Sequence, residues 1–546
     1  EMSRAMQDNI LTVTVSVAKG VPDQSVSLPM RVLARCGEGR GDMHTFADPL
    51  RRAIQVAPNK IAVIDEGASF SFAELYDRCS ALVGALQALG LNRGDRVAIL
   101  AGNSHQYLET YLGVPAGGFV VVPLNTRHAE PELRYALEDS GAKVLLTDRD
   151  PGVFADVVAH IISIPEQYES LLVDATASML GDELGENDLA GLFYTGGTTG
   201  LSKGVMLSHR NLIANTFNWL TAVPQNPDDV FLVIAPMFHA AGSNGILGCI
   251  WMTSCQVTLD AFDPAKALDL IEQHRVTESL GVPTMLAAMA EEQHANPRNT
   301  SSLRLLAHGG SPIATEVIKR TKSAFPTAGL VEVYGATELS PLATILVDEE
   351  LLVDDPRARS CGQPVLGNEI RIFDENGKEV ACGEVGEVVV RGTNVMVGYW
   401  DKPEQTEAVL KDGRYWTGDL GYMDEDGYVF LVDRSKDMIV SGGENVYSTE
   451  VEEVLYQHPA VLEAAAFGVP DEKWGEAVHA VVVPRPEFHN VDPAEIIGFC
   501  RERIAGYKVP KGIDIRDEPL PKSGPGKVLK RVLRAPFWEG QDKSVN

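Results

Sequence analysis

The sequence predicts an α/β protein with layered parallel sheets, a region of antiparallel β structure and a smaller α+β segment at the C-terminus. Three observations predict this fold class. Short β-branched runs alternate with helical periods from Ile61 to His308, short strands with Gly-rich turns occupy Ile370–Val390, and the segment after Asp433 has its own helix and strand signals. Strand and helix in regular alternation indicate parallel strands joined by helical crossovers.

The expected elements follow one another in a regular order. A helix begins at Ser71, where Ser71 and Glu74 have the spacing of a capping box. Further helices are expected near His105–Pro115 and over Leu133–Leu137. Strands are expected over Ile61–Ile64, Arg96–Leu100, Phe119–Pro123, Val144–Thr147, Leu189–Tyr194, Val230–Ala235, Ser279–Leu280 and Leu303–His308.

Residues 1–42 differ from the rest because they show no periodic apolar face, whereas a helical pattern begins at Met43. We expect Met43 to be the natural start and residues 1–42 to be an extension outside the fold. A secretory signal over Ile10–Ala18 is the alternative, but Asp8 and Asn9 precede this apolar stretch where a basic region is required. The expected division is therefore residues 1–42, a large N-terminal domain over 43–433 and a C-terminal domain over 434–546.

Charge and composition exclude several classes of protein. The 546 residues have a formal net charge of −29, whereas proteins that bind nucleic acid or anionic membranes need a surplus of Lys and Arg. No apolar run approaches the ~20 residues of a membrane span. The seven cysteines are scattered without a close CxxC pair, which disfavours a disulfide framework and a zinc site. A reducing cytoplasm fits best.

The most informative motif is a loop rich in glycine and hydroxyl groups that runs from Tyr194 to Gly204 directly after an apolar strand. Glycines let backbone N–H groups turn inward, Thr and Ser hydroxyls add donors, and Lys203 supplies a cation, so the loop suits phosphate oxygens. It is not a Walker A loop, because Gly204 stands where that motif requires Ser or Thr. A flexible surface loop is the alternative interpretation.

Three further motifs offer groups that suit a nucleotide. Gly309–Pro312 is followed by Tyr334–Glu338, which combines an aromatic ring, a hydroxyl and a carboxylate. Trp416–Asp419 precedes Arg434, and a carboxylate with an Arg can bind ribose and phosphate. A Pro/Gly loop near the C-terminus offers Lys527. Taken alone, a strand end with a capped helix, a β-turn and a solvated basic tail would explain these motifs.

Together these motifs resemble the adenylate-forming (ANL) superfamily, in the acyl-CoA synthetase branch that activates fatty or aryl acids. The resemblance extends from Phe46 to Arg534. The phosphate loop departs from the family pattern at Gly196, where Ser is usual, and at Ser202, where Pro is usual. The resemblance implies a β-barrel-like subdomain in the large domain and a small C-terminal domain that moves as a lid.

The resemblance also implies a role for each site residue. Gly310, Ser311 and Tyr334 would line the adenine pocket with Gly335 beside them, Thr337 would touch the α-phosphate, and Glu338 would hold Mg²⁺. Asp419 and Arg434 would bind the ribose and phosphate, and Lys527 would be the catalytic lysine. The loop residues Thr195, Gly196, Gly197, Thr198, Thr199, Gly200 and Lys203 would hold the phosphates, with Thr195 also counted as catalytic.

The second half-reaction has its own expected residues. The C-terminal domain would rotate about Lys436 and present Gly442 and Gly443 to a pantetheine tunnel, while Trp474 and Tyr507 would stack on the adenine of CoA. His239 would stand at the acyl pocket and gate entry of the thiol; a buried structural His is the alternative. His209, at a helix start, is assigned a structural role.

The predicted function is an acid–thiol ligase that uses ATP to make acyl-AMP and pyrophosphate and then acyl-CoA and AMP. The alternatives are an adenylation enzyme that serves a separate carrier protein, a luciferase-type adenylate oxidase, and a nucleotide-binding relative without catalysis. The implied ligands are ATP, Mg²⁺, CoA and a carboxylic acid. We expect a monocarboxylic acid with an apolar body, because the segments that should line its pocket contain no Lys or Arg to bind a second carboxylate. These segments are Asn218-Trp219, His239–Asn244 and Glu338–Thr344. A homodimer is expected only from the family.

Overall fold

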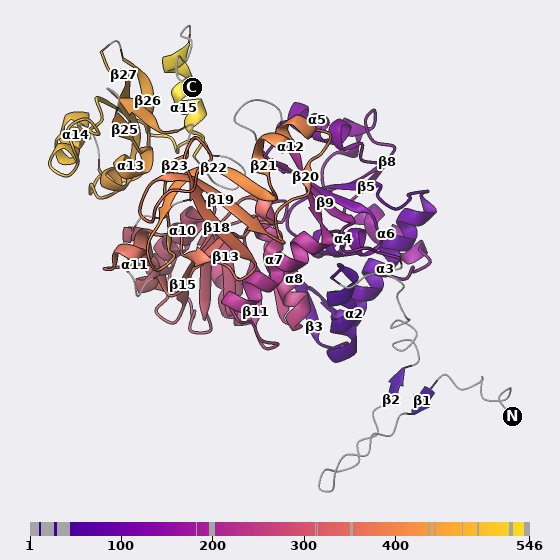
Figure 1. The fold of residues 1–546 in the computed structure, drawn as a ribbon. Coiled ribbons are helices and arrows are strands. Elements are labelled where there is room, and N and C mark those ends of the chain that lie inside the picture. The colour runs from indigo at the N-terminus through magenta and orange to yellow at the C-terminus, as the bar shows by residue number, and fades with distance from the viewer. Residues whose placement is uncertain are drawn as a thin grey trace, which may run out of the picture.

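The computed structural model describes residues 10–12, 27–29 and 44–539, except for residues 182, 196–201, 312, 314, 350–352, 435–436, 442–443, 472, 489–490 and 523–527. The expected extension over residues 1–42 therefore lies outside the described residues, apart from the antiparallel pair β1 (Ile10–Thr12) and β2 (Ser27–Pro29). Figure 1 shows one large body, with the chain after β23 forming a smaller part at its side. Within the described part of the chain, no helix is both long and apolar enough to cross a bilayer.

A nine-stranded sheet forms one half of the large body. Its order is β17-β16-β15-β14-β13-β11-β12-β3-β4, and the strands from β15 to β3 run parallel. The carboxyl ends of parallel strands lie at one edge, so the turns after β11, β14 and β15 lie at the same edge of this sheet. The strands are β3 (Ile61–Asp65), β4 (Ala68–Ser71), β11 (Val230–Val233), β12 (Cys255–Thr258), β13 (Glu278–Gly281), β14 (Leu305–Gly309), β15 (Gly329–Tyr334), β16 (Thr344–Leu346) and β17 (Gln363–Pro364).

A seven-stranded sheet forms the other half, in the order β20-β10-β9-β6-β5-β7-β8. Its inner strands are parallel, whereas β9, β10 and β20 form an antiparallel edge. This edge carries the hairpin of the predicted phosphate loop. The strands are β5 (Arg96–Leu100), β6 (Val120–Pro123), β7 (Val144–Thr147), β8 (His160–Ser163), β9 (Leu189–Thr195), β10 (Lys203–Ser208) and β20 (Gly398–Tyr399).

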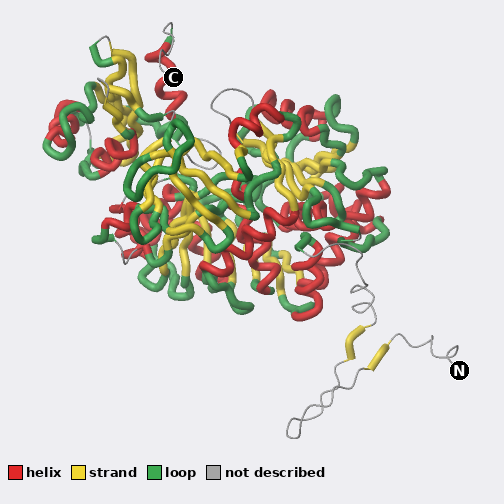
Figure 2. The backbone as a smooth tube through the Cα atoms, in the orientation of Figure 1, coloured by secondary structure: helices red, strands yellow, loops and turns green. Residues whose placement is uncertain are grey.

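Helices cover the two sheets, as the red and yellow segments of Figure 2 show. Helices α7 and α8 lie in the middle of the large body (Figure 1), and their buried residues join one continuous apolar core with residues from both sheets. These helices are α2 (Ala47–Val56), α3 (Phe72–Ala88), α4 (His105–Ala116), α5 (Glu130–Ser140), α6 (Glu166–Asp174), α7 (His209–Ala222), α8 (Ala240–Met252), α9 (Pro264–His274), α10 (Pro283–Ala295), α11 (Thr315–Ala324) and α12 (Pro403–Val409). Short 3-10 helices are η1 (Pro151–Phe154), η2 (Thr337–Leu339) and η4 (Pro356–Arg359).

Two five-stranded sheets follow in the sequence. The first is antiparallel and joins the large body; it consists of β18 (Asn368–Phe373), β19 (Gly386–Gly392), β21 (Leu410–Lys411), β22 (Arg414–Met423) and β23 (Val429–Arg434). The second belongs to the C-terminal part and has its own apolar core. It contains β24 (Ile439–Ser441), β25 (Glu444–Val446), β26 (Val461–Asp471), β27 (Gly475–Pro484) and β28 (Gly512–Ile515), packed with α13 (Ser448–Tyr456), α14 (Pro493–Arg501) and α15 (Lys530–Trp538).

The predicted α/β class and the order of its elements are confirmed. The capping box is present at α3: Ser71 accepts a hydrogen bond from the backbone N–H of Glu74, and the Glu74 carboxylate accepts one from the Ser71 N–H at 2.8 Å. The expected helix at Leu133–Leu137 begins earlier, at Glu130. The antiparallel β structure expected between Ile370 and Val390 is formed by β18 and β19.

Candidate active site

The predicted phosphate loop connects β9 with β10. In the antiparallel pairing of β9 with β10, Thr195 lies opposite Lys203, so both ends of the loop are fixed by backbone hydrogen bonds. The predicted residues Gly196, Gly197, Thr198, Thr199 and Gly200 lie outside the described residues. Since Thr195 and Lys203 are placed by the sheet, the loop begins and ends at a defined point on the edge of the large body.

The predicted adenine residues follow β14 and β15. Gly310 comes directly after β14 and has φ +83°, a conformation that a side chain would strain. Tyr334 is the last residue of β15. A Cβ on the next residue, Gly335, would lie only 1.7 Å from the carbonyl oxygen of Pro341, so this position needs glycine. Gly310, Ser311, Tyr334 and Gly335 therefore share one edge of the nine-stranded sheet.

His239 belongs to the same edge. It follows β11 and is the N-cap of α8, where its Nδ1 accepts a hydrogen bond from the Ala241 N–H at 3.3 Å. Because β11, β14 and β15 are parallel, their carboxyl ends place His239 on the same side of the sheet as Gly310 and Tyr334. Open α/β sheets bind ligands at this edge.

Tyr334 and Asp419 are joined directly. The Tyr334 hydroxyl donates a hydrogen bond to Oδ2 of Asp419 at 2.8 Å. Burial, together with the neighbouring Asp419 charge, holds the pKa of Tyr334 well above its ordinary value, so the hydroxyl stays protonated and remains a donor. The backbone of Asp419 lies opposite Arg434 in the pairing of β22 with β23. The side chain of Arg434 lies outside the described residues.

Thr337 and Glu338 belong to the short helix η2, and only Ala336 separates this helix from Gly335. Thr337 is buried, and the backbone carbonyl of Glu338 accepts a hydrogen bond from the Met396 N–H at 2.8 Å. The carboxylate of Glu338 accepts a second one from the hydroxyl of Tyr399, also at 2.8 Å. Both the backbone and the side chain of Glu338 are therefore fixed by the chain segment that contains Met396 and Tyr399.

Sequence reasoning missed Tyr399, Tyr415 and Asn215. The ring of Tyr399 faces Lys203, whose Nζ lies 4.7 Å from the ring centroid, within the range of a cation–π interaction. Asn215 on α7 accepts a hydrogen bond from the Leu342 N–H at 3.0 Å. No local pattern marks these residues, because each acts on a partner that is distant in the sequence.

The segments expected to line the acyl pocket lie partly together. Asn215 links α7 to the segment that follows Glu338. The predicted Asn218 instead accepts a hydrogen bond from the Gly367 N–H at 2.9 Å, and Trp219 is buried at the interface with α8, near Gly248. The part of α7 that reaches the 338–344 segment is therefore Asn215, one turn earlier than the sequence indicated.

His209 has a structural role, as expected. The helix cap is the preceding residue, Ser208, which forms a capping box with Asn211. His209 is buried, its Nδ1 accepts a hydrogen bond from the Phe46 N–H at 3.2 Å, and burial lowers its pKa to about 4. A neutral imidazole that receives a backbone N–H is part of the core and takes no part in the site.

The residues expected in the C-terminal half are only partly placed. Lys436, Gly442, Gly443 and Lys527 lie outside the described residues. Trp474 lies in the turn between β26 and β27, and Tyr507 lies between α14 and β28; their exposures are 42% and 41%. Such exposure leaves aromatic surface that a base can stack on.

A partly buried ion pair anchors the chain shortly after Lys527. Lys530, the first residue of α15, contacts Glu452 of α13 at 2.8 Å and donates a hydrogen bond to Ser448 Oγ at 2.6 Å. The Ser448 N–H in turn donates a hydrogen bond to Oδ2 of Asp433, near the end of β23, at 2.6 Å. These contacts connect the base of the Lys527 loop with the segment where the hinge is expected.

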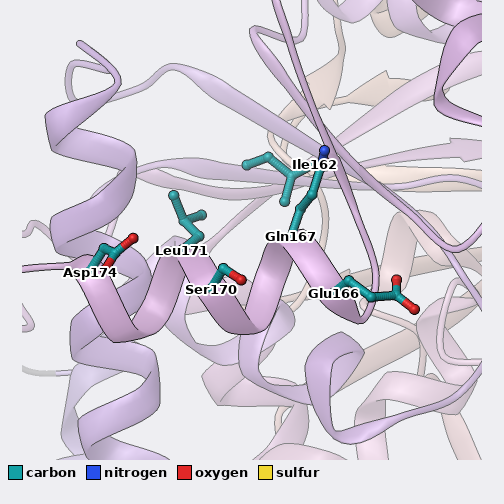
Figure 3. Close-up of a pocket in the computed structure, with 6 residues that line it drawn as sticks. All are labelled: Ile162, Glu166, Gln167, Ser170, Leu171 and Asp174. Atoms are coloured by element: carbon teal, nitrogen blue, oxygen red, sulfur yellow. The ribbon is translucent and has the colours of Figure 1, made fainter.

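A surface hollow lies away from these residues. It is lined by six residues of β8 and α6, with Leu171 and Gln167 rising from the helix toward Ile162 (Figure 3). β8 is at the far edge of the seven-stranded sheet from β10 and β20, which carry Lys203 and Tyr399. The hollow contains two carboxylates, Glu166 and Asp174, and no cation, so it does not suit a nucleotide. The six lining residues are Ile162, Glu166, Gln167, Ser170, Leu171 and Asp174.

Comparison with known proteins agrees with this geometry. Residues 50–400 match the family described as AMP-binding enzyme, and residues 450–527 match the AMP-binding enzyme C-terminal domain. The chain belongs to the AMP-binding enzyme family. The first matched region contains Lys203, Tyr334 and Glu338. The second contains Trp474, Tyr507 and Lys527.

Relatives in this family cover nearly the whole chain. A feruloyl-CoA synthase from Amycolatopsis sp is 40% identical over 90% of this chain and 98% of that protein. A long-chain-fatty-acid–CoA ligase from Bacillus subtilis is 34% identical over 87% of this chain and 91% of that protein. The crystal structure of ATP-bound MatB from Rhodopseudomonas palustris is similar with a TM-score of 0.83 and 33% identity, covering 90% of this chain and 99% of that one.

The protein is an acyl-CoA synthetase of the adenylate-forming superfamily, in the branch of fatty-acid and aryl-acid CoA ligases. It uses ATP and CoA and forms acyl-CoA from a carboxylic acid by way of an acyl-AMP. The alternatives of a carrier-protein adenylation enzyme and of a relative without catalysis are not favoured.

Proposed function

We propose that the acid is an aromatic, cinnamic-type monocarboxylate, and that the site residues act as follows. The carrying observation is the convergence of Tyr334, Glu338 and Asp419 at one edge of the nine-stranded sheet, with Tyr399 connecting Glu338 to Lys203. Two carboxylates, each hydrogen-bonded to a tyrosine, stand beside the start of a strand that carries a lysine. This set suits a nucleotide whose ribose, metal and phosphates need different partners.

In adenylation, Asp419 accepts hydrogen bonds from the ribose hydroxyls, and Tyr334 offers its ring to the adenine with Gly310, Ser311 and Gly335 around it. Thr337 donates to the α-phosphate, Arg434 binds the sugar or phosphate, and Lys203 with Thr195 and the glycine-rich loop holds the departing pyrophosphate. A carboxylate oxygen of the acid attacks the α-phosphorus, and the bond to pyrophosphate breaks. The Lys527 ammonium offsets the charge that develops in this step.

Glu338 fits a magnesium ion on the nucleotide. Mg²⁺ is commonly held by one or two carboxylates together with substrate phosphates, so a single glutamate suffices. When bound, the ion would draw charge from the phosphate oxygens and favour departure of pyrophosphate.

In the second half-reaction the C-terminal domain acts as a lid. We propose that residues 434–546 rotate about Lys436, so that Gly442 and Gly443 approach the pantetheine while Trp474 and Tyr507 stack on the CoA adenine. Separate apolar cores in the two domains support a rigid-body movement of this kind. The CoA sulfur attacks the acyl carbonyl carbon, the bond between that carbon and the phosphate oxygen of AMP breaks, and AMP departs while the thiol proton passes to solvent. His239 is proposed to gate entry of the thiol.

Two observations support an aromatic monocarboxylate as the acid. The feruloyl-CoA synthase is 40% identical to this chain, whereas the long-chain-fatty-acid ligase is 34% identical. The segments 215–219, 239–244 and 338–344 contain no Lys or Arg to bind a second carboxylate. The lack of a cation favours a monocarboxylate over a diacid. The higher identity to the feruloyl-CoA synthase favours an aromatic acid over a fatty acid.

A panel of acids ranked by kcat/KM tests this choice. The panel contains ferulic, cinnamic, benzoic, octanoic, palmitic and malonic acids, each assayed with ATP and CoA, with pyrophosphate release and acyl-CoA formation measured in the same reaction. A cinnamic-type acid should have the highest kcat/KM, and each poorly fitting group on another acid should lower kcat/KM by roughly 10–200-fold. Palmitic acid as the best substrate would assign the chain to fatty acids instead. Malonic acid as the best substrate would contradict the monocarboxylate assignment as well.

A further inference from the structure

Tyr399 connects two oppositely charged residues of the candidate site. Its hydroxyl donates a hydrogen bond to Oε1 of Glu338 at 2.8 Å, and its ring lies under Lys203, with Nζ 4.7 Å from the centroid. Tyr399 is only 6% exposed. Its backbone is held in β20, paired with β10 in the register that sets Tyr399 opposite Val205. The strand that begins at Lys203 therefore also fixes the position of the tyrosine.

A second tyrosine lies near the first. Burial and the Glu338 charge raise the pKa of Tyr399, and Tyr415 on β22 is close enough to act against them by lowering it. Tyr415 is 5% exposed and lies four residues before Asp419 on the same strand. Tyr415 therefore lies on the strand that carries Asp419 and near the tyrosine that donates to Glu338.

The arrangement keeps both charges available to a ligand. Among the residues that the structure describes, no ion pair contains either Glu338 or Lys203. A direct ion pair between them would neutralise the carboxylate needed for a cation and the ammonium needed for phosphate. Tyr399 instead holds the carboxylate with a neutral donor and the ammonium with the face of its ring. Burial raises the pKa of Tyr399, and the Glu338 charge raises it further, so the hydroxyl stays protonated.

We propose that Tyr399 is a positioning residue for adenylation: it holds the Mg²⁺-binding Glu338 and the phosphate-binding Lys203 in fixed relation, with Tyr415 supporting it. This proposal rests on the roles of Glu338 and Lys203 under the proposed function. Tyr399 acts through these two groups. Its effect should therefore appear in the half-reaction that uses ATP and Mg²⁺.

The test is Tyr399→Phe, which removes the hydroxyl and keeps the ring. Acyl-AMP formation should slow on the order of tenfold, because a hydrogen bond to a charged group is lost, and the Mg²⁺ concentration for half-maximal rate should rise. Thioester formation from supplied acyl-AMP and CoA should stay within about twofold of the parent rate, since that step does not use the triphosphate. Tyr415→Phe should show the same pattern with a smaller change.

The control is Tyr168→Phe. The Tyr168 hydroxyl donates to buried Glu109 at 2.9 Å, so this variant also removes a buried tyrosine–carboxylate hydrogen bond, but on α6, beyond the opposite edge of the sheet. It should leave both half-reactions and the Mg²⁺ response unchanged. Tyr399→Leu also removes the ring. This variant should in addition weaken the binding of pyrophosphate in the reverse reaction, which forms ATP from acyl-AMP and pyrophosphate.

Two results would overturn the proposal. One is Tyr399→Phe with the parent Mg²⁺ response and adenylation rate. The other is an equal loss in both half-reactions, which indicates a general structural defect. Failure of the proposed function has a different signature, because the parent enzyme itself would then release no pyrophosphate with any acid of the panel.

Discussion

The hydroxyl of Tyr334 donates to Oδ2 of Asp419 at 2.8 Å, although 85 positions separate the two residues in the sequence. Tyr334 ends a strand of the nine-stranded sheet, and Asp419 lies in the antiparallel sheet that packs beside it. The hydrogen bond orients the carboxylate that should receive the ribose. It also connects the two sheets at the proposed nucleotide site.

Asp419→Asn should weaken the binding of ATP more than the binding of the acid. The amide keeps the size of the side chain but replaces one strong acceptor by a donor, so hydrogen bonds from the ribose are lost. We expect KM for ATP to rise on the order of tenfold or more. Tyr334→Phe should raise it less, because it removes only the orienting hydrogen bond. ATP-dependence measured at saturating acid tests both variants, and unchanged KM values would contradict the assigned role.

Lys527→Met should separate the two half-reactions. Loss of one charge that stabilises a developing anion typically costs about 10²–10³ in rate. We expect this loss in acyl-AMP formation, with little change when acyl-AMP and CoA are supplied. Lys522→Met, which removes a neighbouring lysine paired with Glu463 at 2.6 Å, is the matched control and should leave adenylation near the parent rate. Undiminished acyl-AMP formation by Lys527→Met would refute the catalytic role.

His105 should make stability decline at alkaline pH. Burial alone would lower the pKa of His105, but hydrogen bonds with Asp65 at 2.7 Å and Glu169 at 3.4 Å raise it to about 9, above the ordinary 6.5. A raised pKa means that the contribution is complete below pH 6.5, decreases between 6.5 and 9, and is lost above 9. His105→Gln should lower the free energy of unfolding by about 1–3 kcal/mol at pH 6 and flatten this alkaline decline. Urea unfolding at pH 6, 8 and 10 measures both effects.

His209 should contribute to acid sensitivity. Burial lowers its pKa to about 4, so between pH 6.5 and 4 the unfolded chain binds a proton that the folded chain does not. Stability is therefore complete above pH 6.5 and decreases as pH falls toward 4. His209→Gln should be less stable at pH 7, because the Phe46 N–H loses its partner, but should show a shallower decline on acidification. Parallel slopes for the parent and the variant would mean that another group titrates.

Local interactions could be predicted from the sequence because their partners are close in the chain. Ser71 and Glu74 cap α3 as their spacing indicates, and the strand at Arg96–Leu100 was located by its apolar run. Tyr399 could not be found in this way. Its partners Glu338 and Lys203 come from other elements, and a tyrosine between Gly398 and Trp400 has no local sign of function. The contact of Asn215 could not be predicted for the same reason, because its partner, the Leu342 N–H, is distant in the sequence.

By itself the sequence determined the α/β order, the loop between Tyr194 and Gly204, and the residue types that suit a nucleotide, because strand periodicity, caps and glycine turns depend on neighbouring residues. The tertiary structure alone decided which of these groups meet. Parallel strands brought His239, Gly310 and Tyr334 to one edge, and the antiparallel pairing of β20 with β10 set Tyr399 between Glu338 and Lys203. Distances between distant residues follow from sheet register and buried packing, which no short stretch of sequence contains.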